Sequence, residues 1–354
     1  MDSSRPRMIK VNSARLDDKA ILEAVRVLRS GELILLPTET VYGLAADPAV
    51  PGAEERIFAA KERERGKPIP LLASGLDAVE RAGAVISTKA RRLARRYWPG
   101  PLTLVLSCGG RAEGFRVPDH PVALAVLKRA GGLLRVTSAN VSGEPAASTM
   151  EEALEALGAK VALALDSGPA PLGMASTVVD ATGESLKIIR QGALPREAVM
   201  GKPKVLFVCT GNTCRSPMAE HLFRKWMGRE SGWEVESAGV AACDGQPASP
   251  GAIQALEGKK LDLSAHRSRL LRQAHIDDAD LIVVMTRAHQ GAVVQRFPRA
   301  RDRVVLLNAF SPRHPDEDVP DPFGGKDAVY RTIRDEIEAA MPDLVLHVRG
   351  LYSQ

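Results

Sequence analysis

The stretch VCTGNTCRSPMAE, residues 208–220, places two cysteines and an arginine immediately before a predicted helix. The apolar run at 205–208 predicts a buried strand that delivers Cys209 to its carboxyl end, where open α/β sheets bind ligands. Arg215 follows six residues later, and the glycine and asparagine between them allow a loop to curl with its N–H groups inward. Such a loop, leading at once into a helix near Ser216, holds a dianion with backbone donors and the positive helix end.

The residue types in this loop predict phosphoryl chemistry on sulfur. The positive field predicts a lowered pKa for the Cys209 thiol and therefore a thiolate at neutral pH. Arg215 offers a planar fork that grips two phosphoryl oxygens. Two ordinary buried cysteines fit the Cys-x5-Arg-Ser-Pro spacing less well, and a metal site lacks further thiolates or histidines nearby. The predicted cradle between nucleophile and clamp consists of Thr210, Gly211, Asn212, Thr213 and Cys214.

An acid must protonate the leaving group, and a base must then activate water. Asp321 in DVPDPFGG, residues 318–325, is the best candidate, because prolines fix its loop and glycines let the loop close. A solvated turn aspartate is the alternative.

Alternating strands and helices divide the chain into two α/β domains. After Lys204 the pattern predicts strands at 204–209, 280–286 and 304–307, and a last helix with Val329, Ile333 and Ile337 on one stripe. This order indicates a doubly wound domain with a parallel sheet.

The N-terminal part predicts an α/β domain with a large twisted mixed sheet, because extended apolar runs recur between helical segments. One such segment opens at Asp17 and Asp18 and sets Ile21, Val25 and Leu28 on one face. Residues 196–203 break the periodicity and indicate a linker. We therefore expect domains at 1–195 and 204–354.

Composition limits the function classes. With 354 residues, 45% of them hydrophobic, the chain has room for two cores. No apolar run of transmembrane length and no signal peptide are visible, so we expect a soluble, cytoplasmic protein without membrane contact. Four cysteines make neither a disulfide framework nor a zinc pattern, so no metal site is expected. The formal charge of +5 suits anionic substrates without demanding nucleic acid.

Residues 204–354 resemble the low-molecular-weight protein-tyrosine phosphatase family. The resemblance rests on the loop, the Asp321 segment, and the motifs SAGV at 237–240 and LSAHRSRLL at 263–271. It implies that Cys209 forms a phosphocysteine, that Arg215 clamps phosphate and that no cofactor is needed. It also implies that the Ser216 hydroxyl stabilises the thiolate and that Asp321 is the general acid.

Within this family the loop is similar to a bacterial branch that removes phosphate from arginine in proteins. Thr213 stands where tyrosine-directed members often carry a larger aliphatic residue, and the rim shows no obvious aromatic residue. We therefore favour phosphoarginine over phosphotyrosine in a phosphoprotein substrate. A reversible disulfide between Cys209 and Cys214 would shield the nucleophile. Arsenate reduction is an alternative, but only Cys243 remains downstream.

Three segments stand out in the first domain: PTETVYGLAAD at 37–47, KERERGKPIPLL at 61–72 and TSANVSGEPA at 137–146. They combine cations suited to a polyphosphate with neutral donors after a predicted strand. No Gly-x4-Gly-Lys-Ser/Thr loop is present, so a nucleotide would not be held in that way.

With WPGPLT at 98–103 and STVVD at 176–180, residues 8–195 resemble the YrdC-type threonylcarbamoyl-AMP synthase family. The resemblance implies that L-threonine, bicarbonate or CO2, and ATP with Mg2+ yield threonylcarbamoyl-adenylate for N6-threonylcarbamoyladenosine in transfer RNA. It places ATP on Lys61, Arg63, Lys67, Ser138, Asn140 and Arg190. It places threonine on Thr40, Arg116 and Ser176, with Arg116 pairing the carboxylate. Two departures are Leu72, where many members have histidine, and Ala112, where a hydroxyl is common.

Two other readings of the first domain stay open. The run KARRLARRYW, 89–98, could contact transfer RNA, although we favour an amphipathic helix with Leu93 and Tyr97 inward. Proteins of transfer RNA modification are candidate partners. The domain could also be a nucleotide sensor that regulates the phosphatase.

Overall fold

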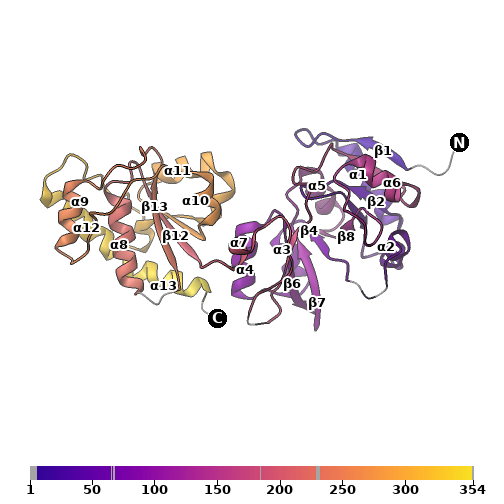
Figure 1. The fold of residues 1–354 in the computed structure, drawn as a ribbon, viewed down its shortest axis with the longest axis horizontal. Coiled ribbons are helices and arrows are strands. Elements are labelled where there is room, and N and C mark those ends of the chain that lie inside the picture. The colour runs from indigo at the N-terminus through magenta and orange to yellow at the C-terminus, as the bar shows by residue number, and fades with distance from the viewer. Residues whose placement is uncertain (1–5, 65, 67, 184, 229–231, 353–354) are drawn as a thin grey trace. The chain divides into compact units, whose positions relative to one another are not determined.

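The structure is a computed structural model that describes residues 6–64, 66, 68–183, 185–228 and 232–352. It divides the chain into two compact units, Met1–Met200 and Gly201–Gln354 (Figure 1). Each unit has its own sheet and its own core.

A mixed sheet of eleven described strands organises the first unit, in the order β1-β9-β2-β3-β8-β4-β7-β6-β10-β11, with β5 paired to β6. Its strands are β1 Arg7–Lys10, β2 Ile34–Leu36, β3 Gly43–Ala46, β4 Leu71–Ala73, β5 Ala84–Val85, β6 Leu102–Cys108, β7 Arg111–Arg116, β8 Leu133–Ser138, β9 Leu163–Asp166, β10 Thr177–Asp180 and β11 Lys187–Arg190. The sheet contains parallel pairs such as β1 with β9 and antiparallel pairs such as β3 with β8, which confirms the predicted mixed α/β class.

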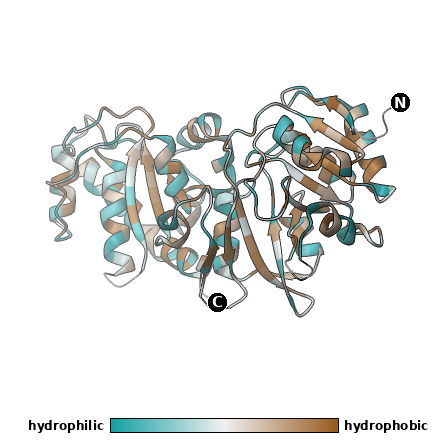
Figure 2. Ribbon diagram, turned by 45° about the vertical axis from the view of Figure 1, so that its right-hand side comes forward, coloured by the Kyte–Doolittle hydropathy of each residue, from teal (hydrophilic) through white to brown (hydrophobic). Residues whose placement is uncertain are grey.

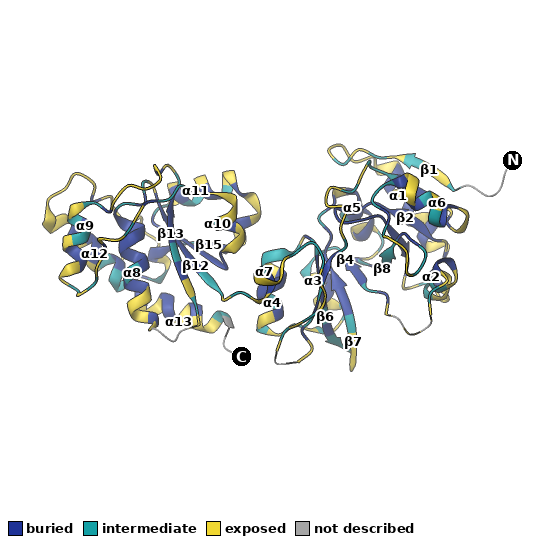
Figure 3. Ribbon diagram, in the orientation of Figure 1, coloured by how far each residue is buried: buried dark blue, intermediate teal, exposed yellow. Residues whose placement is uncertain are grey.

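Helices cover this sheet through apolar faces. They are α1 Asp18–Arg29, α2 Ala53–Lys61, α3 Leu76–Arg81, α4 Thr88–Tyr97, α5 Pro121–Arg129, α6 Met150–Leu157 and α7 Arg196–Met200. Asp17 caps α1 by accepting the N–H of Lys19, and the predicted stripe of Ile21, Val25 and Leu28 is buried. Figures 2 and 3 show the consequence: hydrophobic, buried residues follow the strands, while the outer helix faces are polar and exposed. Each fully buried aliphatic side chain contributes about 1.5–3 kcal/mol.

Two segments of the first unit bear on the predictions. Helix α4 is amphipathic as predicted, with Leu93 fully buried and the Tyr97 hydroxyl donating to the carbonyl of Ala198 at 2.7 Å. The region predicted as the linker 196–203 differs, because Arg196–Met200 forms α7 and Val199 is fully buried in the first unit's core. A single buried valine was too weak a signal against the surrounding Gly and Pro.

The second unit is doubly wound, as predicted. Its parallel sheet has the order β13-β12-β14-β15, formed by β12 Lys204–Cys209, β13 Glu234–Gly239, β14 Leu281–Val284 and β15 Val304–Leu306. Its helices are α8 Arg215–Met227, α9 Pro250–Glu257, α10 Gln273–Asp278, α11 Arg287–Arg296, α12 Asp327–Ala339 and α13 Met341–Tyr352. Phe207 packs with α8 and α12 on one face, and Leu206 and Val208 pack with α10 and α11 on the other.

The structure corrects one detail of the predicted last helix. The buried stripe of α12 contains Tyr330, Ile333 and Ile337, whereas the predicted Val329 is 43% exposed. Strand β13 was not predicted, because the run EVESAG alternates charged and small residues. All six residues of β13 pair with β12, so β13 lies directly beside the strand that leads into the loop after Cys209.

Candidate active sites

The loop between β12 and α8 is held in shape by Asn212. This residue has a φ of 55° in the left-handed region, which asparagine tolerates better than most residues. Its fully buried amide donates to the hydroxyls of Ser216 at 3.0 Å and Ser237 at 2.9 Å, and its Oδ1 accepts the N–H of Arg269 at 2.8 Å. The curled loop is therefore preorganised by its own contacts.

Cys209 is buried at the base of this loop, with its side-chain sulfur 3.0 Å from the hydroxyl of Ser216. Ser216 accepts from Asn212, and its own hydroxyl hydrogen has two acceptors within reach, the Cys209 sulfur and the carbonyl of Ala238 at 3.4 Å. Burial raises the pKa of the Cys209 thiol, and hydrogen bonds from Ser216 and the charge of Arg215 act in the opposite direction. The predicted net lowering is thus wrong for the free chain, because burial outweighs the donors.

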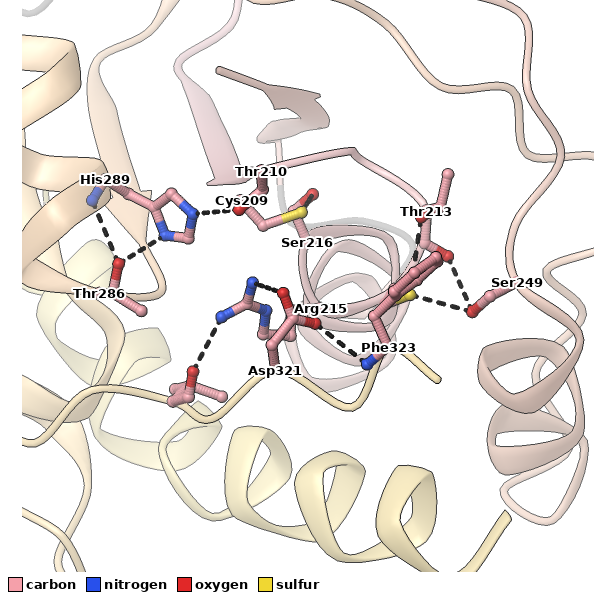
Figure 4. A network of polar contacts seen from close by, with 12 residues as sticks. Cys209, Thr210, Thr213, Arg215, Ser216, Ser249, Thr286, His289, Asp321 and Phe323 are labelled. Carbon is pink, nitrogen blue, oxygen red and sulfur yellow. Dashed lines mark hydrogen bonds and ion pairs between the residues drawn. The ribbon is translucent and has the colours of Figure 1, made fainter. Parts of the chain in front are cut away.

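The contacts of Arg215 explain part of the balance between burial and charge that sets the pKa of Cys209. The Arg215 Nη2 donates to Asp321 Oδ2 at 2.5 Å and its Nη1 to the carbonyl of Val319 at 3.0 Å (Figure 4). The carboxylate neutralises the guanidinium and weakens its field at the sulfur. Arg215 is 4% exposed, and its Nε has no hydrogen-bond partner in the described part of the chain, which leaves a buried donor for an anion.

The remaining loop residues divide between two sides of the site (Figure 4). The exposed Thr210 lies on the side of His289, with Oγ1 2.9 Å from Nε2. Thr213 lies on the side of Ser249, whose N–H donates to the Thr213 carbonyl at 2.9 Å. Cys214 Sγ lies 3.1 Å from the Ser249 hydroxyl.

Sequence reasoning missed the aromatic residue on the Asp321 loop. Phe323 is 77% exposed, and its N–H donates to Asp321 Oδ1 at 3.2 Å. The expectation of a rim without an aromatic side chain therefore needs correction. Its position two residues after Asp321 in the sequence could have indicated an aromatic side chain near the site.

The first unit has a cavity of about 470 Å³ lined by residues of strands and of the loops beside them. Its lining includes six of the predicted ligand residues: Thr40, Arg63, Arg116, Ser138, Ser176 and Arg190. Leu72 and Ala112, the two departures, also line it and make part of its wall apolar. The structure thus brings predicted nucleotide and threonine residues around one space.

Three guanidinium groups line this cavity, those of Arg63, Arg116 and Arg190, together with one carboxylate, that of Asp180. Burial lowers the pKa of Arg190, and the charges of Arg116 and Arg63 lower it further. The Nη2 of Arg190 donates to the carbonyl of Ser176 at 2.9 Å. Like charges held together in a partly buried space favour an anionic ligand.

Lys61 and Asn140 are not in the lining. Lys61 is 1% exposed, and its ammonium donates to the carbonyls of Ser138 and Asn140. Burial, and then the charge of Arg63, lowers its pKa to about 8. Asn140 donates to the carbonyls of Val141 and Glu144, each at 2.8 Å. In the free chain both residues fix the loop after β8, and Lys67 lies outside the described residues.

Glu39 was not predicted as a site residue. Its Oε1 lies 2.7 Å from Nη2 of Arg116, and both side chains are 8% exposed. Arg116 also donates from Nε to the carbonyl of Gly100 at 3.1 Å. The arginine expected to bind a threonine carboxylate therefore already has a carboxylate partner.

No cluster of three or more His, Cys, Asp or Glu side chains suited to a metal ion occurs in the described residues. Nor does any helix within those residues combine the length and apolar character needed to cross a membrane.

Comparisons with known proteins match the two units to different families. Residues 26–192 match the Sua5/YciO/YrdC family, described as "Telomere recombination", and residues 204–351 match "Low molecular weight phosphotyrosine protein phosphatase". A putative threonylcarbamoyl-AMP synthase of Mycobacterium tuberculosis is 36% identical over 191 residues, covering 51% of this chain and 88% of that protein. A protein-arginine-phosphatase of Geobacillus stearothermophilus is 45% identical over 141 residues, covering 40% of this chain and 93% of that protein.

A solved structure of a Pyrococcus abyssi Sua5 variant matches with a TM-score of 0.52 and 25% identity, covering 84% of this chain and 98% of its own. The chain spans only 56% of the Bacillus subtilis threonylcarbamoyl-AMP synthase, to which it is 32% identical over 194 residues. The chain belongs to the Sua5/YciO/YrdC family in its first part and to the low-molecular-weight phosphotyrosine protein phosphatase family in its second.

Proposed function

We propose that the chain is a bifunctional cytoplasmic enzyme. Its first unit makes threonylcarbamoyl-AMP for transfer RNA modification, and its second unit removes phosphate from protein arginine. The observation that carries the first activity is the cavity with three arginines. The second rests on Cys209, Arg215 and Asp321 around one preorganised loop. Cys108, Cys209, Cys214 and Cys243 are free thiols in the structure.

In the first reaction the threonine amine and bicarbonate form a carbamate with loss of water. A carbamate oxygen attacks the α-phosphorus of ATP, and pyrophosphate leaves. This step needs positioning and charge neutralisation, which Arg63 and Arg190 would supply to the triphosphate. Mg2+ would arrive on the triphosphate, since Asp180 carries the one carboxylate among the described residues that line the cavity.

In the second reaction Cys209 attacks phosphorus as a thiolate, the form that hydrogen bonds from Ser216 and the charge of Arg215 favour against the effect of burial, and the bond to the leaving nitrogen breaks. Asp321 gives its proton to that nitrogen and then takes one from the water that hydrolyses the phosphocysteine. Arg215 would hold two phosphoryl oxygens in both steps. Its contact with Asp321 in the free chain must therefore give way when phosphate binds.

Thr213 favours arginine as the phosphorylated residue, because a small hydroxyl side chain suits a guanidinium better than an aromatic ring. The exposed Phe323 favours phosphotyrosine as the second candidate, since it offers a surface for stacking.

Pyrophosphate release from ATP by the whole protein tests the first unit, with threonine and bicarbonate each omitted in turn. Release that requires both is expected. ATP binding without that requirement would instead support the nucleotide sensor.

Initial rates on matched phosphoarginine and phosphotyrosine peptides test the second unit. A higher kcat/KM on phosphoarginine is expected, together with incorporation of phosphate into the protein that is lost in Cys209→Ala, which has no nucleophilic atom at this position. A preference for phosphotyrosine would move the assignment to the second candidate.

A further inference from the structure

The cavity of the first unit has a polar end and an apolar end, and the register of the sheet sets their order. Leu72 on β4 pairs with Arg116 on β7, while Val178 on β10 pairs with Thr103 on β6 and with Arg190 on β11. All five residues line the cavity, and their strands follow one another as β4-β7-β6-β10-β11. Because neighbouring strands lie about 4.8 Å apart, the backbones of Arg116 and Arg190 are separated by three spacings, roughly 14 Å. Leu72 lies on the side of Arg116 away from Arg190.

Apolar side chains wall the cavity beyond Arg116. Pro70, Leu72 and Val136 line it there, and the Val136 N–H donates to the Pro70 carbonyl at 3.1 Å. Leu72 is 3% exposed and Val136 is 5% exposed, so this wall is closely packed. None of the three side chains carries a polar atom. A group that docks here is therefore stabilised by apolar burial rather than by hydrogen bonds.

Four hydroxyls that line the cavity already bond one another in pairs. Thr103 Oγ1 lies 2.8 Å from Ser176 Oγ, and Thr40 Oγ1 lies 2.9 Å from Thr38 Oγ1. The Thr38 hydroxyl donates to the carbonyl of Val41 at 2.6 Å, so Thr40 is the donor in its pair. The hydrogen of Thr40 is thus engaged before a substrate hydroxyl arrives.

The proposed reaction fixes two of the groups on the α-carbon of the acceptor amino acid. The carboxylate pairs with Arg116, whose Nη1 has no hydrogen bond or ion pair within the described residues. The nitrogen carries the carbamate that attacks the α-phosphorus, so it faces the triphosphate at Arg63 and Arg190. The tetrahedral carbon then directs the side chain away from the triphosphate, into the apolar end beside Leu72.

We propose that the first unit adenylates the carbamates of β-branched amino acids, L-valine as well as L-threonine, and that Leu72 and Val136 set this breadth. The inference rests on the proposed adenylate-forming activity and widens its acceptor class. With valine, as with threonine, the amine and bicarbonate lose water, a carbamate oxygen bonds to the α-phosphorus, and the bond to pyrophosphate breaks. Threonine and valine have nearly the same shape, and an apolar pocket separates such isosteres by at most about 10²-fold. A site built to bond a substrate hydroxyl rejects the analogue that lacks it by about 10⁴- to 10⁵-fold.

The experiment follows pyrophosphate release by the whole protein with ATP, bicarbonate and one amino acid at a time. L-Threonine should be favoured over L-valine by no more than about tenfold in kcat/KM. L-Serine, which keeps the hydroxyl and lacks the methyl group, should be worse than L-valine by about tenfold or more, since one such group in an apolar pocket is worth about 10- to 200-fold.

Variants of the wall test where this selectivity arises. Leu72→Asn adds an amide, and Val136→Thr adds a hydroxyl in the same shape, so each should raise the preference for threonine over valine by about tenfold. Leu22→Asn, at a 53% exposed position on α1, makes the first of these changes outside the cavity and should keep the wild-type ratio. Titration with ATP identifies the folded variants, and Val136→Thr decides where Leu72→Asn does not bind ATP.

Each outcome decides. A wild type that favours threonine over valine by more than tenfold would overturn the inference and leave the proposed activity standing, with Thr137 in the lining as the partner to test for the hydroxyl. Serine that equals valine, or folded wall variants with an unchanged ratio, would overturn the inference as well. Absence of release with every amino acid would overturn the proposed activity and the inference together.

Discussion

Arg215 and Asp321 form an ion pair in the free chain, with Nη2 2.5 Å from Oδ2. The arginine side chain is 5% exposed and the aspartate 48% exposed. Asp321 therefore occupies a guanidinium position that a phosphoryl oxygen needs. Phosphate must replace the carboxylate, and the freed Asp321 can then face the leaving group.

Asp321→Asn separates these two roles. Loss of the general acid should lower kcat on phosphoarginine by about 10²- to 10⁴-fold. Loss of the competing carboxylate should tighten binding of inorganic phosphate, measured as a product inhibition constant. Weaker phosphate binding in this variant would contradict the competition between Asp321 and the anion.

Arg116→Met should destabilise the first unit by about 3–5 kcal/mol, because it leaves Glu39 buried without its counter-charge. Apart from the ion pair with Arg116, neither Glu39 carboxylate oxygen has a hydrogen-bond partner in the described structure, so the buried carboxylate depends mainly on this pair. The double variant Arg116→Met, Glu39→Gln should recover most of the stability but not threonine-dependent pyrophosphate release. Calorimetry and the release assay check the two effects. Threonine use restored in the double variant would remove Arg116 from the threonine site.

Lys61→Met should lower the stability of the first unit by about 1–3 kcal/mol, because the carbonyls of Ser138 and Asn140 lose their donor. The KM for ATP should rise, since Ser138 lines the cavity. Thermal unfolding and ATP titration measure these changes. Lys128→Met, at an exposed position on α5, is the control. Unchanged unfolding of Lys61→Met would show that the carbonyls find water instead.

His289 predicts a pH dependence of the second unit. Its pKa is about 4 in the folded chain against an ordinary value of 6.5, so the unfolded chain binds more protons between these values. Stability should therefore fall as pH drops through this window, by at most about 1.4 kcal/mol per pH unit for this group. His289→Gln should show a smaller loss between pH 6.5 and 4 in calorimetry. Parallel curves for the two proteins would contradict the buried neutral ring.

The sequence predicted the candidate site correctly where its residues follow one another in a single loop. Cys209, Arg215 and the residues between them lie in one loop, so spacing alone indicated the cradle. The pairing of Arg215 with Asp321, and of Arg116 with Glu39, joins distant segments and had no local signal. Pattern also could not separate a lysine aimed at a ligand from Lys61, which is aimed at backbone carbonyls.

The degree to which a side chain is buried was the second property that the sequence pattern could not predict. The pattern at 196–200 looked like a linker because Gly and Pro surround it, yet Val199 reaches the core. The charge and helix field at Cys209 suggested a thiolate, but only the structure shows that burial dominates.

The position of β12 has a consequence for how such a chain can be built. The strand enters the second unit at Lys204 and ends at the nucleophile, so its six residues separate the attachment point from the reacting sulfur by roughly 17–20 Å. Whatever precedes Lys204 is joined at the amino edge of the sheet, and the substrate arrives at the carboxyl edge. The point of covalent attachment and the nucleophile are therefore at opposite ends of one strand.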